Sequence, residues 1–357
     1  MVSVIHYVMD YKGVGVGVTY EDVALRAQVS TATVSRVLSG AGYVRPELAR
    51  RVLAAAQELG YRHNRAARAL RRNRSDTIGL VISDIEQPFF ASIARAVEAE
   101  AAAQDRPVLL CNTDEDLDQE RLYIGLLIEE RVAGVIMAPS TPNPAVLEPL
   151  FQAGIPTVAV DRRIDGDPVS SVLVGNHAGA RALVNDLLAH GHRHIAAVSG
   201  TTEATPSRER MEACREAVAA APGAILYEAE GKLKEAIGVV PTIELARRLA
   251  IELLDGPTPP TAFFCANGVL TQGVLQALRQ RGLKVPADVA LVGFDDLPVF
   301  ELLESPLTVA AQPTEMLGRR AARLLFQAID NPDAPPEIVI LPPVLHWRAS
   351  CGHNTDV

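Results

Sequence analysis

The segment from residue 30 to residue 38 combines short polar side chains with few charges. Val34, Val37 and Leu38 recur at helical spacing and predict one apolar face. A helix that is merely solvated usually carries Glu and Lys on the opposite face. Short polar side chains with one arginine instead favour close approach to base edges and phosphate groups. This outer face comprises Thr31, Ala32, Thr33, Ser35 and Arg36.

A second group of residues with chemical potential follows the predicted strands of the remaining chain. Apolar runs typical of buried parallel strands, such as TIGLVIS, PTVAV and DVALVGF, alternate with amphipathic helical stretches. Ligands of doubly wound sheets bind beyond the carboxyl ends of the strands. Carboxylates, an amide and aromatic rings there suit a polyhydroxylated ligand, although each residue could instead cap a strand or join two lobes by a salt bridge. These residues are Asp84, Phe89, Phe90, Asp161, Arg162, Asn267 and Asp295, and Gln312 follows a crossover strand.

Patterns that would indicate an enzyme or a metal site are weak in this sequence. His190, His192 and His194 alternate in the way of metal ligands, but Gly191 between them is better explained as the end of a helix. The sequence has no GxSxG, Walker or HExxH motif, and no recognisable nucleophile accompanies the acidic pair at Asp295. We therefore expect no catalytic residue, no metal and no cofactor.

The elements that position the polar helix are predicted to be three short helices within residues 19–60. Thr19 can cap the first helix, with Asp22 placed for a capping box. Ser30 can cap the second helix after a tight turn, and Pro46 suits the first turn of the third. Two helices joined by a short turn predict a helix-turn-helix.

Charge is distributed unevenly along the chain. The net charge is -9, but residues 19–74 carry a net +7, so the rest of the chain carries -16. A basic module on an acidic body is typical of a DNA-binding head, although a basic solvated helix pair is the alternative. Residues 61–75 are rich in arginine and alanine and predict a linker that is helical only when something holds it. Residues 1–18 are expected to be a flexible tail, and whether they belong to the native protein stays open.

These motifs resemble the lactose-repressor/galactose-repressor family. The head reads VTYEDVALRAQVSTATVSRVLSGAGYV, and TIGLVISDIEQPFF, LLAHGHRHIAAVSG and GLKVPADVALVGFDD follow in the family's order, so the resemblance covers roughly residues 18–352. It implies an all-α helix-turn-helix head, a hinge helix and an α/β body, whose two doubly wound parallel-sheet lobes are similar to periplasmic sugar-binding proteins. The expected lobes are about 76–161 with 291–325, and about 162–290 with 326–352.

The resemblance also implies roles for individual residues. Such proteins bind near-palindromic operator DNA as homodimers and respond to a small molecule between the lobes. Thr31 and Ala32 would face base edges, and Arg36 would reach a guanine or a phosphate. Leu70 would wedge between base steps in the minor groove, unless it simply packs on the body. The phosphate contacts would be Tyr20, Ser30, Thr33 and Ser35, the hinge residues Asn64, Arg65, Ala67 and Leu70, and the cleft arginine Arg210.

Several positions depart from the family pattern. Arg45 stands where Ser or Thr usually caps the third helix, which should cost about 1 kcal/mol. Gly268 replaces an aspartate, and Ala213 and Cys214 replace a glycine and an aromatic residue after Arg210. The purine-binding branch has an arginine where this chain has Ala204. We therefore expect a sugar or sugar derivative, and not a purine, as effector.

Three other functions compete with an allosteric repressor. A solute-binding protein predicts a signal peptide and no head, and a sugar-modifying enzyme predicts a catalytic motif. The third alternative keeps DNA binding but places a protein corepressor on the body. No apolar run reaches the roughly 18 residues that span a bilayer. The four cysteines are scattered without CxxC spacing, which favours a reducing, cytoplasmic location.

Overall fold

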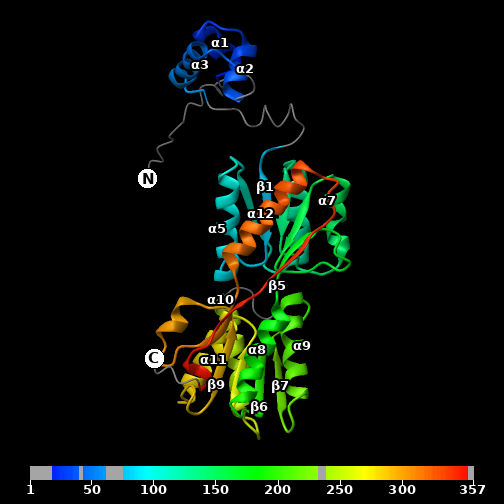
Figure 1. Ribbon diagram of the computed structural model, residues 1–357, viewed down its shortest axis with the longest axis vertical. Helices are drawn as coiled ribbons and strands as arrows, with labels where there is room; N and C mark the ends of the chain where they lie inside the picture. Colours follow the sequence, from blue (N-terminus) through cyan, green and yellow to red (C-terminus); the bar gives the residue numbers. More distant parts are fainter. Residues whose placement is uncertain (1–17, 40–42, 62–74, 232–238, 353–357) are drawn as a thin grey trace, which may run out of the picture. The chain divides into compact units, whose positions relative to one another are not determined.

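The computed structural model describes residues 18–39, 43–61, 75–231 and 239–352. The chain forms two compact units, a head within residues 1–72 and a body from residue 73 onward (Figure 1). The expected tail and most of the expected linker lie outside the described residues. The roles expected for Asn64, Arg65, Ala67 and Leu70 therefore stay predictions.

The head consists of the three predicted helices, α1 (Tyr20–Ala27), α2 (Thr31–Ser39) and α3 (Pro46–Glu58). The predicted capping box is present, because Thr19 and Asp22 each accept a hydrogen bond from the other's backbone N–H. The helices enclose a small apolar core whose buried members are Val23, Ala24, Ala27, Val34, Val52, Ala55 and Ala56.

The first sheet of the body has the strand order β11-β5-β4-β3-β1-β2 and is parallel throughout. Strand β1 lies at an inner position, and its side chains are buried on both faces. The strands of this sheet are β1 (Ile78–Ile82), β2 (Val108–Asn112), β3 (Gly134–Met137), β4 (Thr157–Val160), β5 (Ser170–Val174) and β11 (Ile338–Leu341).

The second sheet has the corresponding order β12-β10-β9-β8-β6-β7, in which only the edge strand β12 runs antiparallel. Two equivalent sheets with mainly parallel strands confirm the predicted pair of α/β lobes. The strands are β6 (His194–Ser199), β7 (Ile225–Glu230), β8 (Ala262–Cys265), β9 (Ala290–Phe294), β10 (Thr308–Ala311) and β12 (Val344–His346).

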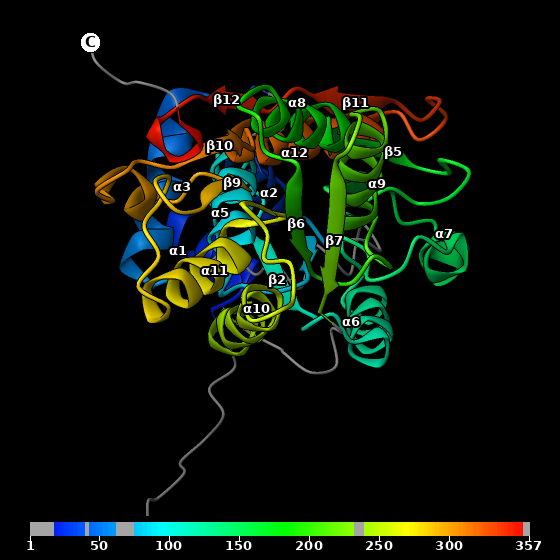
Figure 2. The same ribbon diagram turned by 90° about the horizontal axis from the view of Figure 1, so that it is seen from below.

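Helices cover both faces of each sheet. In the second sheet, a Cβ on Gly293 would meet α11, whereas the neighbouring Phe294 meets α8 on the opposite face (Figure 2). In the first sheet, a Cβ at Gly79 would meet a side chain of α6, whereas a Cβ at Gly134 would meet a side chain of α12 on the opposite face. The helices of the body are α5 (Pro88–Ala102), α6 (Leu117–Glu129), α7 (Glu148–Gln152), α8 (Asn176–Ala189), α9 (Thr205–Ala219), α10 (Val239–Leu254), α11 (Gly268–Gln280) and α12 (Thr314–Asp330).

Strand pairing corrects the expected limits of the lobes. Strand β5 pairs with β4 in the first lobe, whereas β9 and β10 pair with each other in the second. Strand β11 then returns to the first sheet. The chain therefore crosses between lobes after β5, after β10 and after β11. An apolar run shows that a strand is buried, but not which sheet its hydrogen bonds will join, so sequence reasoning misplaced these crossings.

Candidate functional site

The first turn of α2 presents the polar face predicted from the sequence. Thr31, Ala32 and Arg36 are exposed on it, while Val34 points into the core of the head. Ser30 caps the helix by accepting a hydrogen bond from the N–H of Thr33 at 3.2 Å. The polar face of α2 is thus exposed to solvent, and the side chain of Ser30 fixes the start of the helix.

The other residues expected to contact phosphates lie around this turn. The hydroxyl groups of Ser30 and Thr33 lie 2.9 Å apart, and Ser35 is half-buried. The ring of Tyr20 packs against the ring of Tyr61, with 5.6 Å between centroids. The structure therefore groups these side chains in the head, and their contact with phosphate stays a prediction.

Arg45, just before α3, and Arg51, within it, have contrasting roles. Arg45 makes no side-chain capping hydrogen bond at the start of the helix, as expected for a residue without an acceptor. Arg51, which sequence reasoning missed, donates a hydrogen bond of 2.5 Å to the carbonyl oxygen of Ala27 at the end of α1. Arg51 therefore ties α3 to the turn that precedes the polar helix.

The two lobes place one carboxylate each at equivalent strand ends. Asp161 follows β4 and Asp295 follows β9, the third strand along each sheet. Both residues have left-handed backbones, with φ of +67° and +70°, which aspartate tolerates better than most residues. The two carboxylates are close enough to interact electrostatically. They define the core of the candidate cleft.

Asp295 already has two hydrogen-bond donors. Its carboxylate accepts from the N–H of Gly268 at 3.1 Å and from the side-chain amide of Gln312 at 2.6 Å. A Cβ at Gly268 would lie 3.0 Å from Leu297, so glycine allows this close approach. Asn267 caps α11 by accepting from the N–H of Leu270 at 2.8 Å. The departure from the family at Gly268 thus lies at the start of α11, where its backbone N–H binds Asp295.

Arg210 lies on α9 in the second lobe, and its positive charge interacts with the carboxylates of Asp161 and Asp295. The side chain is buried and donates to Asn176 at 2.9 and 2.7 Å and to the carbonyl oxygen of Ala266 at 2.6 Å. The guanidinium also stacks 3.7 Å from the ring centroid of Phe294. Burial lowers its pKa. Arg210 therefore occupies its predicted place, held by neighbours of its own lobe.

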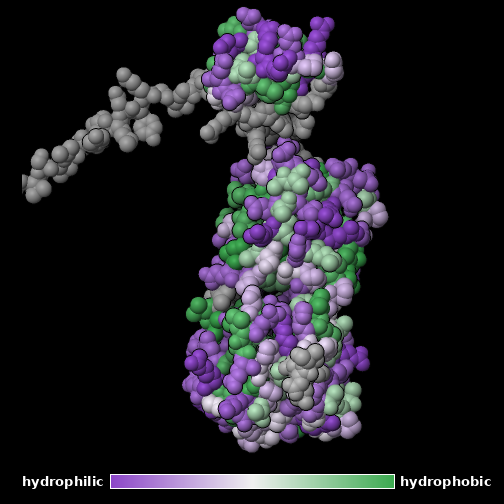
Figure 3. Space-filling model, turned by 60° about the vertical axis from the view of Figure 1, so that its left-hand side comes forward, coloured by the Kyte–Doolittle hydropathy of each residue, from purple (hydrophilic) through white to green (hydrophobic). Residues whose placement is uncertain are grey.

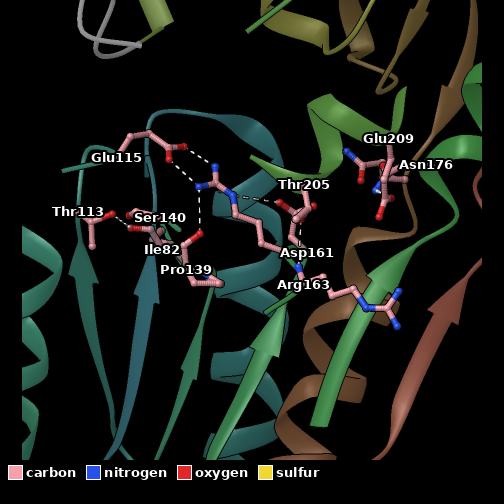
Figure 4. A network of polar contacts seen from close by, with 12 residues as sticks. Ile82, Thr113, Glu115, Pro139, Ser140, Asp161, Arg163, Asn176, Thr205 and Glu209 are labelled. Atoms are coloured by element: carbon pink, nitrogen blue, oxygen red, sulfur yellow. Dashed lines mark hydrogen bonds and ion pairs between the residues drawn. The ribbon is translucent and has the colours of Figure 1, made fainter. Parts of the chain in front are cut away.

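Arg162 is the corresponding cation of the first lobe. It forms a two-pronged ion pair with Glu115, and also donates 3.2 Å to the carbonyl oxygen of Pro139 (Figure 4). Its Nε lies 3.8 Å from the carboxylate of Asp161. Its guanidinium lies 5.9 Å from the ring centroid of Phe90. The terminal donors of this predicted ligand residue are thus already engaged within the protein.

The remaining predicted cleft residues belong to the loop after β1 and the start of α5. Asp84 accepts hydrogen bonds from Glu86 N–H at 2.9 Å and from the side chain of Gln87 at 3.3 Å, which makes it a local cap. Phe89 is half-buried and lies edge-on to the buried Phe90, with 5.0 Å between centroids. A role of Asp84 in ligand binding therefore has less geometric support than that of Asp161.

Burial changes the protonation of the first-lobe carboxyls. Burial raises the pKa of Asp161 to about 6. The positive charges of Arg162 and Arg210 lower this pKa, and the negative charges of Asp295 and Glu115 raise it. Burial also raises the pKa of Asp84. The charge of Asp161 therefore changes at about pH 6.

Sequence reasoning missed three residues that join this network. Glu115 follows β2 and Asn176 follows β5, so the strand-end rule could have found both. Thr205, at the start of α9, accepts a hydrogen bond of 3.1 Å from the N–H of Arg163, which links the two lobes. A cavity of about 210 Å³ at this crossing is lined by Asp161, Arg163, Asn176, Thr205 and Glu209, among others.

Ala204 directly precedes Thr205 at the start of α9 and lies beside Arg162 and Arg163, whereas two other departures from the family pattern lie away from these polar groups. Ala213 and Cys214 are fully buried in the hydrophobic core under α9. Gly191 has φ of +91° and ends α8, as predicted. No group of three or more His, Cys, Asp or Glu that could hold a metal ion occurs among residues 18–39, 43–61, 75–231 and 239–352. Within the same ranges, no helix has the length and apolarity to span a membrane.

Both units of the chain match known protein families. Residues 19–64 match "Bacterial regulatory proteins, lacI family", and residues 184–351 match "Periplasmic binding protein-like domain". The chain is 37% identical over 314 residues to the ribose operon repressor of Halalkalibacterium halodurans, covering 88% of this chain and 91% of that protein.

Two solved structures are similar over most of the chain or of the body. The lac repressor dimer bound to operator and the anti-inducer ONPF has a TM-score of 0.82 at 26% identity, over 94% of this chain and 99% of that chain. A LacI family transcriptional regulator from Enterococcus faecium with bound ribose has a TM-score of 0.68 at 27% identity, over 77% of this chain and 98% of that chain.

Proposed function

This chain belongs to the lacI family of bacterial regulatory proteins. From this premise we propose that it is a repressor whose affinity for operator DNA is controlled by a small neutral sugar. The observation that carries the proposal is that Asp161 and Asp295 end equivalent strands of the two lobes, with Arg210 interacting electrostatically with both, in a chain that also bears a helix-turn-helix head. Ribose is the first sugar to test, because a ribose operon repressor and a ribose-bound regulator are similar to this chain.

DNA recognition is assigned to the exposed start of α2. Thr31 and Ala32 are short enough to let the helix approach base edges, and Arg36 can donate two hydrogen bonds to a guanine. Replacing Arg36 by Met should cost about 1–3 kcal/mol of specific affinity, with little change on unrelated DNA. Gel-shift titrations on operator and random duplex measure this difference. Equal losses on both duplexes would assign Arg36 to the phosphate backbone instead.

Effector binding is assigned to the cleft between the lobes. A sugar hydroxyl can donate a hydrogen bond to the carboxylate of Asp161, which lies 3.8 Å from the Nε of Arg162. Isothermal titration with ribose tests this assignment, and Asp161→Asn should weaken binding. A thermal-shift screen of sugars, nucleosides and phosphorylated metabolites extends the test. If no small molecule stabilises the protein, control by a protein corepressor becomes the better account.

A dimer is proposed because a near-palindromic operator needs two heads. A groove of about 720 Å³ between α5 and β2 is lined mainly by apolar residues, together with Ser92, Arg95 and Glu98, and Leu110 in it is 42% exposed. Leu302, on the second lobe, is 83% exposed. Figure 3, which brings the α5 side forward, shows hydrophobic surface on both lobes. Sedimentation equilibrium tests the dimer, and substituting Leu110 by Glu should shift the chain toward monomer.

The linker is proposed to carry the signal from the body to the head. Hinge residues whose ordering on the operator changes when the effector binds, in either direction, would couple the two sites. Leu70→Ala should weaken operator affinity and leave effector affinity intact. Unchanged operator affinity in a gel-shift titration would remove Leu70 from this role.

A further inference from the structure

We propose that Glu115 determines the charge specificity of the cleft, by occupying the guanidinium of Arg162 and so selecting neutral sugars over anionic ones such as sugar phosphates. The proposal rests on the proposed function, because it concerns the same effector site. It goes further in naming which chemical class the site rejects and which residue is responsible.

The first step is the geometry of the ion pair. Both terminal nitrogens of Arg162 donate to the carboxylate of Glu115, one of them at 2.6 Å, and the pair is nearly buried, with 9% and 13% of the two side chains exposed. Pro139 takes a further hydrogen bond from the same guanidinium. A ligand phosphate or carboxylate would need this fork for two-pronged binding, and Glu115 already fills it.

The second step is the loop that presents Glu115. Asp114 and Glu115 both have left-handed backbones, with φ of +50° and +59°. Consecutive non-glycine residues in this region are strained, and such strain persists where surrounding contacts enforce it. Here the side chain of Asn112 donates to Asp114 at 2.6 Å and accepts from the N–H of Ile85 at 2.7 Å. Asp116 then caps α6. The loop is thus held in a conformation that directs Glu115 at Arg162.

The third step is the charge around Arg162. Besides Glu115, the carboxylates of Asp161 and Glu120 interact with it electrostatically. Glu120 is fully buried and accepts a hydrogen bond of 2.7 Å from the N–H of Ser140. One guanidinium therefore faces three carboxyl groups, so this wall of the cleft carries no surplus positive charge. An anionic ligand would meet repulsion, whereas hydroxyl groups can donate to Asp161.

The second lobe strengthens the same selection. The guanidinium of Arg210 is held by Asn176, by the carbonyl oxygen of Ala266 and by the face of Phe294. Arg163, which also lines the interlobe cavity, pairs with Asp167 close by in its own loop. Of Arg162 and Arg210, Arg162 is thus the one whose partner is a charged side chain that a single isosteric substitution can neutralise. Removing the charge of Glu115 isolates its contribution.

The test compares the wild type with Glu115→Gln and with Asp118→Asn. Asp118 lies nearby on α6 and pairs with the exposed Arg121, so its variant makes the same change in net charge outside the cleft. Titration calorimetry measures the affinities for ribose and for its 5-phosphate at constant ionic strength. Glu115→Gln should move the ratio of affinities toward the phosphate by about tenfold. This change lies between the effect of removing one charge in water and the effect of removing it from a partly buried charge pair. Asp118→Asn should leave the ratio unchanged.

A second readout does not depend on the identity of the sugar. Thermal shift with sodium sulfate, against sodium chloride at equal ionic strength, reports whether a guanidinium has become available to an oxyanion. Glu115→Gln should gain a sulfate-dependent shift that wild type lacks, and Glu115→Gln/Arg162→Gln should lose it again. If wild type does not bind ribose, the proposed effector fails, yet the sulfate experiment still decides the role of Glu115.

The proposal is overturned if the affinity ratio and the sulfate response of Glu115→Gln equal those of wild type. It is also overturned if Asp118→Asn produces the same change, because a general charge effect would then explain the data. Circular dichroism checks that each variant is folded. If Glu115→Gln is unfolded, Glu115→Asp carries the test: its shorter arm should give a smaller change in the same direction, and no change contradicts the proposal.

Discussion

The raised pKa of Asp161 predicts opposite effects of pH on folding and on effector binding. Asp161 is 5% exposed, and burial raises its pKa from 3.8 to about 6. Between these two values the folded protein keeps a proton on Asp161 that the unfolded chain has lost. Stability from this group is therefore greatest at low pH and declines as pH rises through about 6.

The size of the effect follows from the shift. About two pKa units correspond to about 3 kcal/mol over the full titration, of which about 2 kcal/mol falls between pH 4.5 and pH 7.5. Asp161→Asn has no such titration. The free energy of unfolding of wild type relative to Asp161→Asn should therefore decrease by about 2 kcal/mol from pH 4.5 to pH 7.5.

Effector binding should respond in the opposite direction, because a sugar hydroxyl donates best to the ionised carboxylate. The affinity of wild type should fall about tenfold from pH 7.5 to pH 5. Urea unfolding and calorimetric titration at matched pH values measure the two trends. If the stability difference between wild type and Asp161→Asn is the same at pH 4.5 and pH 7.5, Asp161 has an ordinary pKa and the reasoning from burial is refuted.

Three further substitutions test the packing and capping of the structure. Gly273→Ala should lower the free energy of unfolding by about 1–3 kcal/mol, because its Cβ would overlap the carbonyl oxygen of Ile243; unchanged urea midpoints would contradict this close approach. Arg45→Ser should stabilise the start of α3 by about 1 kcal/mol, measured as slower amide exchange in its first turn. Thr205→Val removes the acceptor of the interlobe hydrogen bond, so the N–H of Arg163 should exchange faster while amides of the head keep their rates.

Local signals in the sequence predicted the parts of the fold that local chemistry determines. Thr19 and Ser30 begin helices as expected, because a side-chain oxygen can satisfy an amide two or three residues away without help from distant chain. The strand-end rule located Asp161 and Asp295 for a similar reason: the carboxyl ends of parallel strands gather at one edge whatever the strand order.

Features that depend on distant partners could not be predicted in this way. The sequence suggests Arg162 as a ligand donor, but its terminal donors are taken by Glu115, which is 47 residues away. Asp84 has the right place after a strand, yet its carboxylate caps its own loop. Residue type and position give a side chain's chemistry, whereas its partners depend on the tertiary arrangement of several loops.

The two equivalent aspartates differ in a way that suggests how the cleft works. Asp295 accepts from Gly268 and Gln312, so its acceptor needs are largely met before any ligand arrives. Among the residues that the structure describes, none donates a hydrogen bond to the carboxylate of Asp161, and its ion-pair contact with the Nε of Arg162 is long, at 3.8 Å. A buried carboxylate without a close donor gains more from a new hydrogen bond than a satisfied one does. The free energy of effector binding should therefore depend more on Asp161 than on Asp295, and Asp161→Asn should cost more affinity than Asp295→Asn despite their equivalent positions.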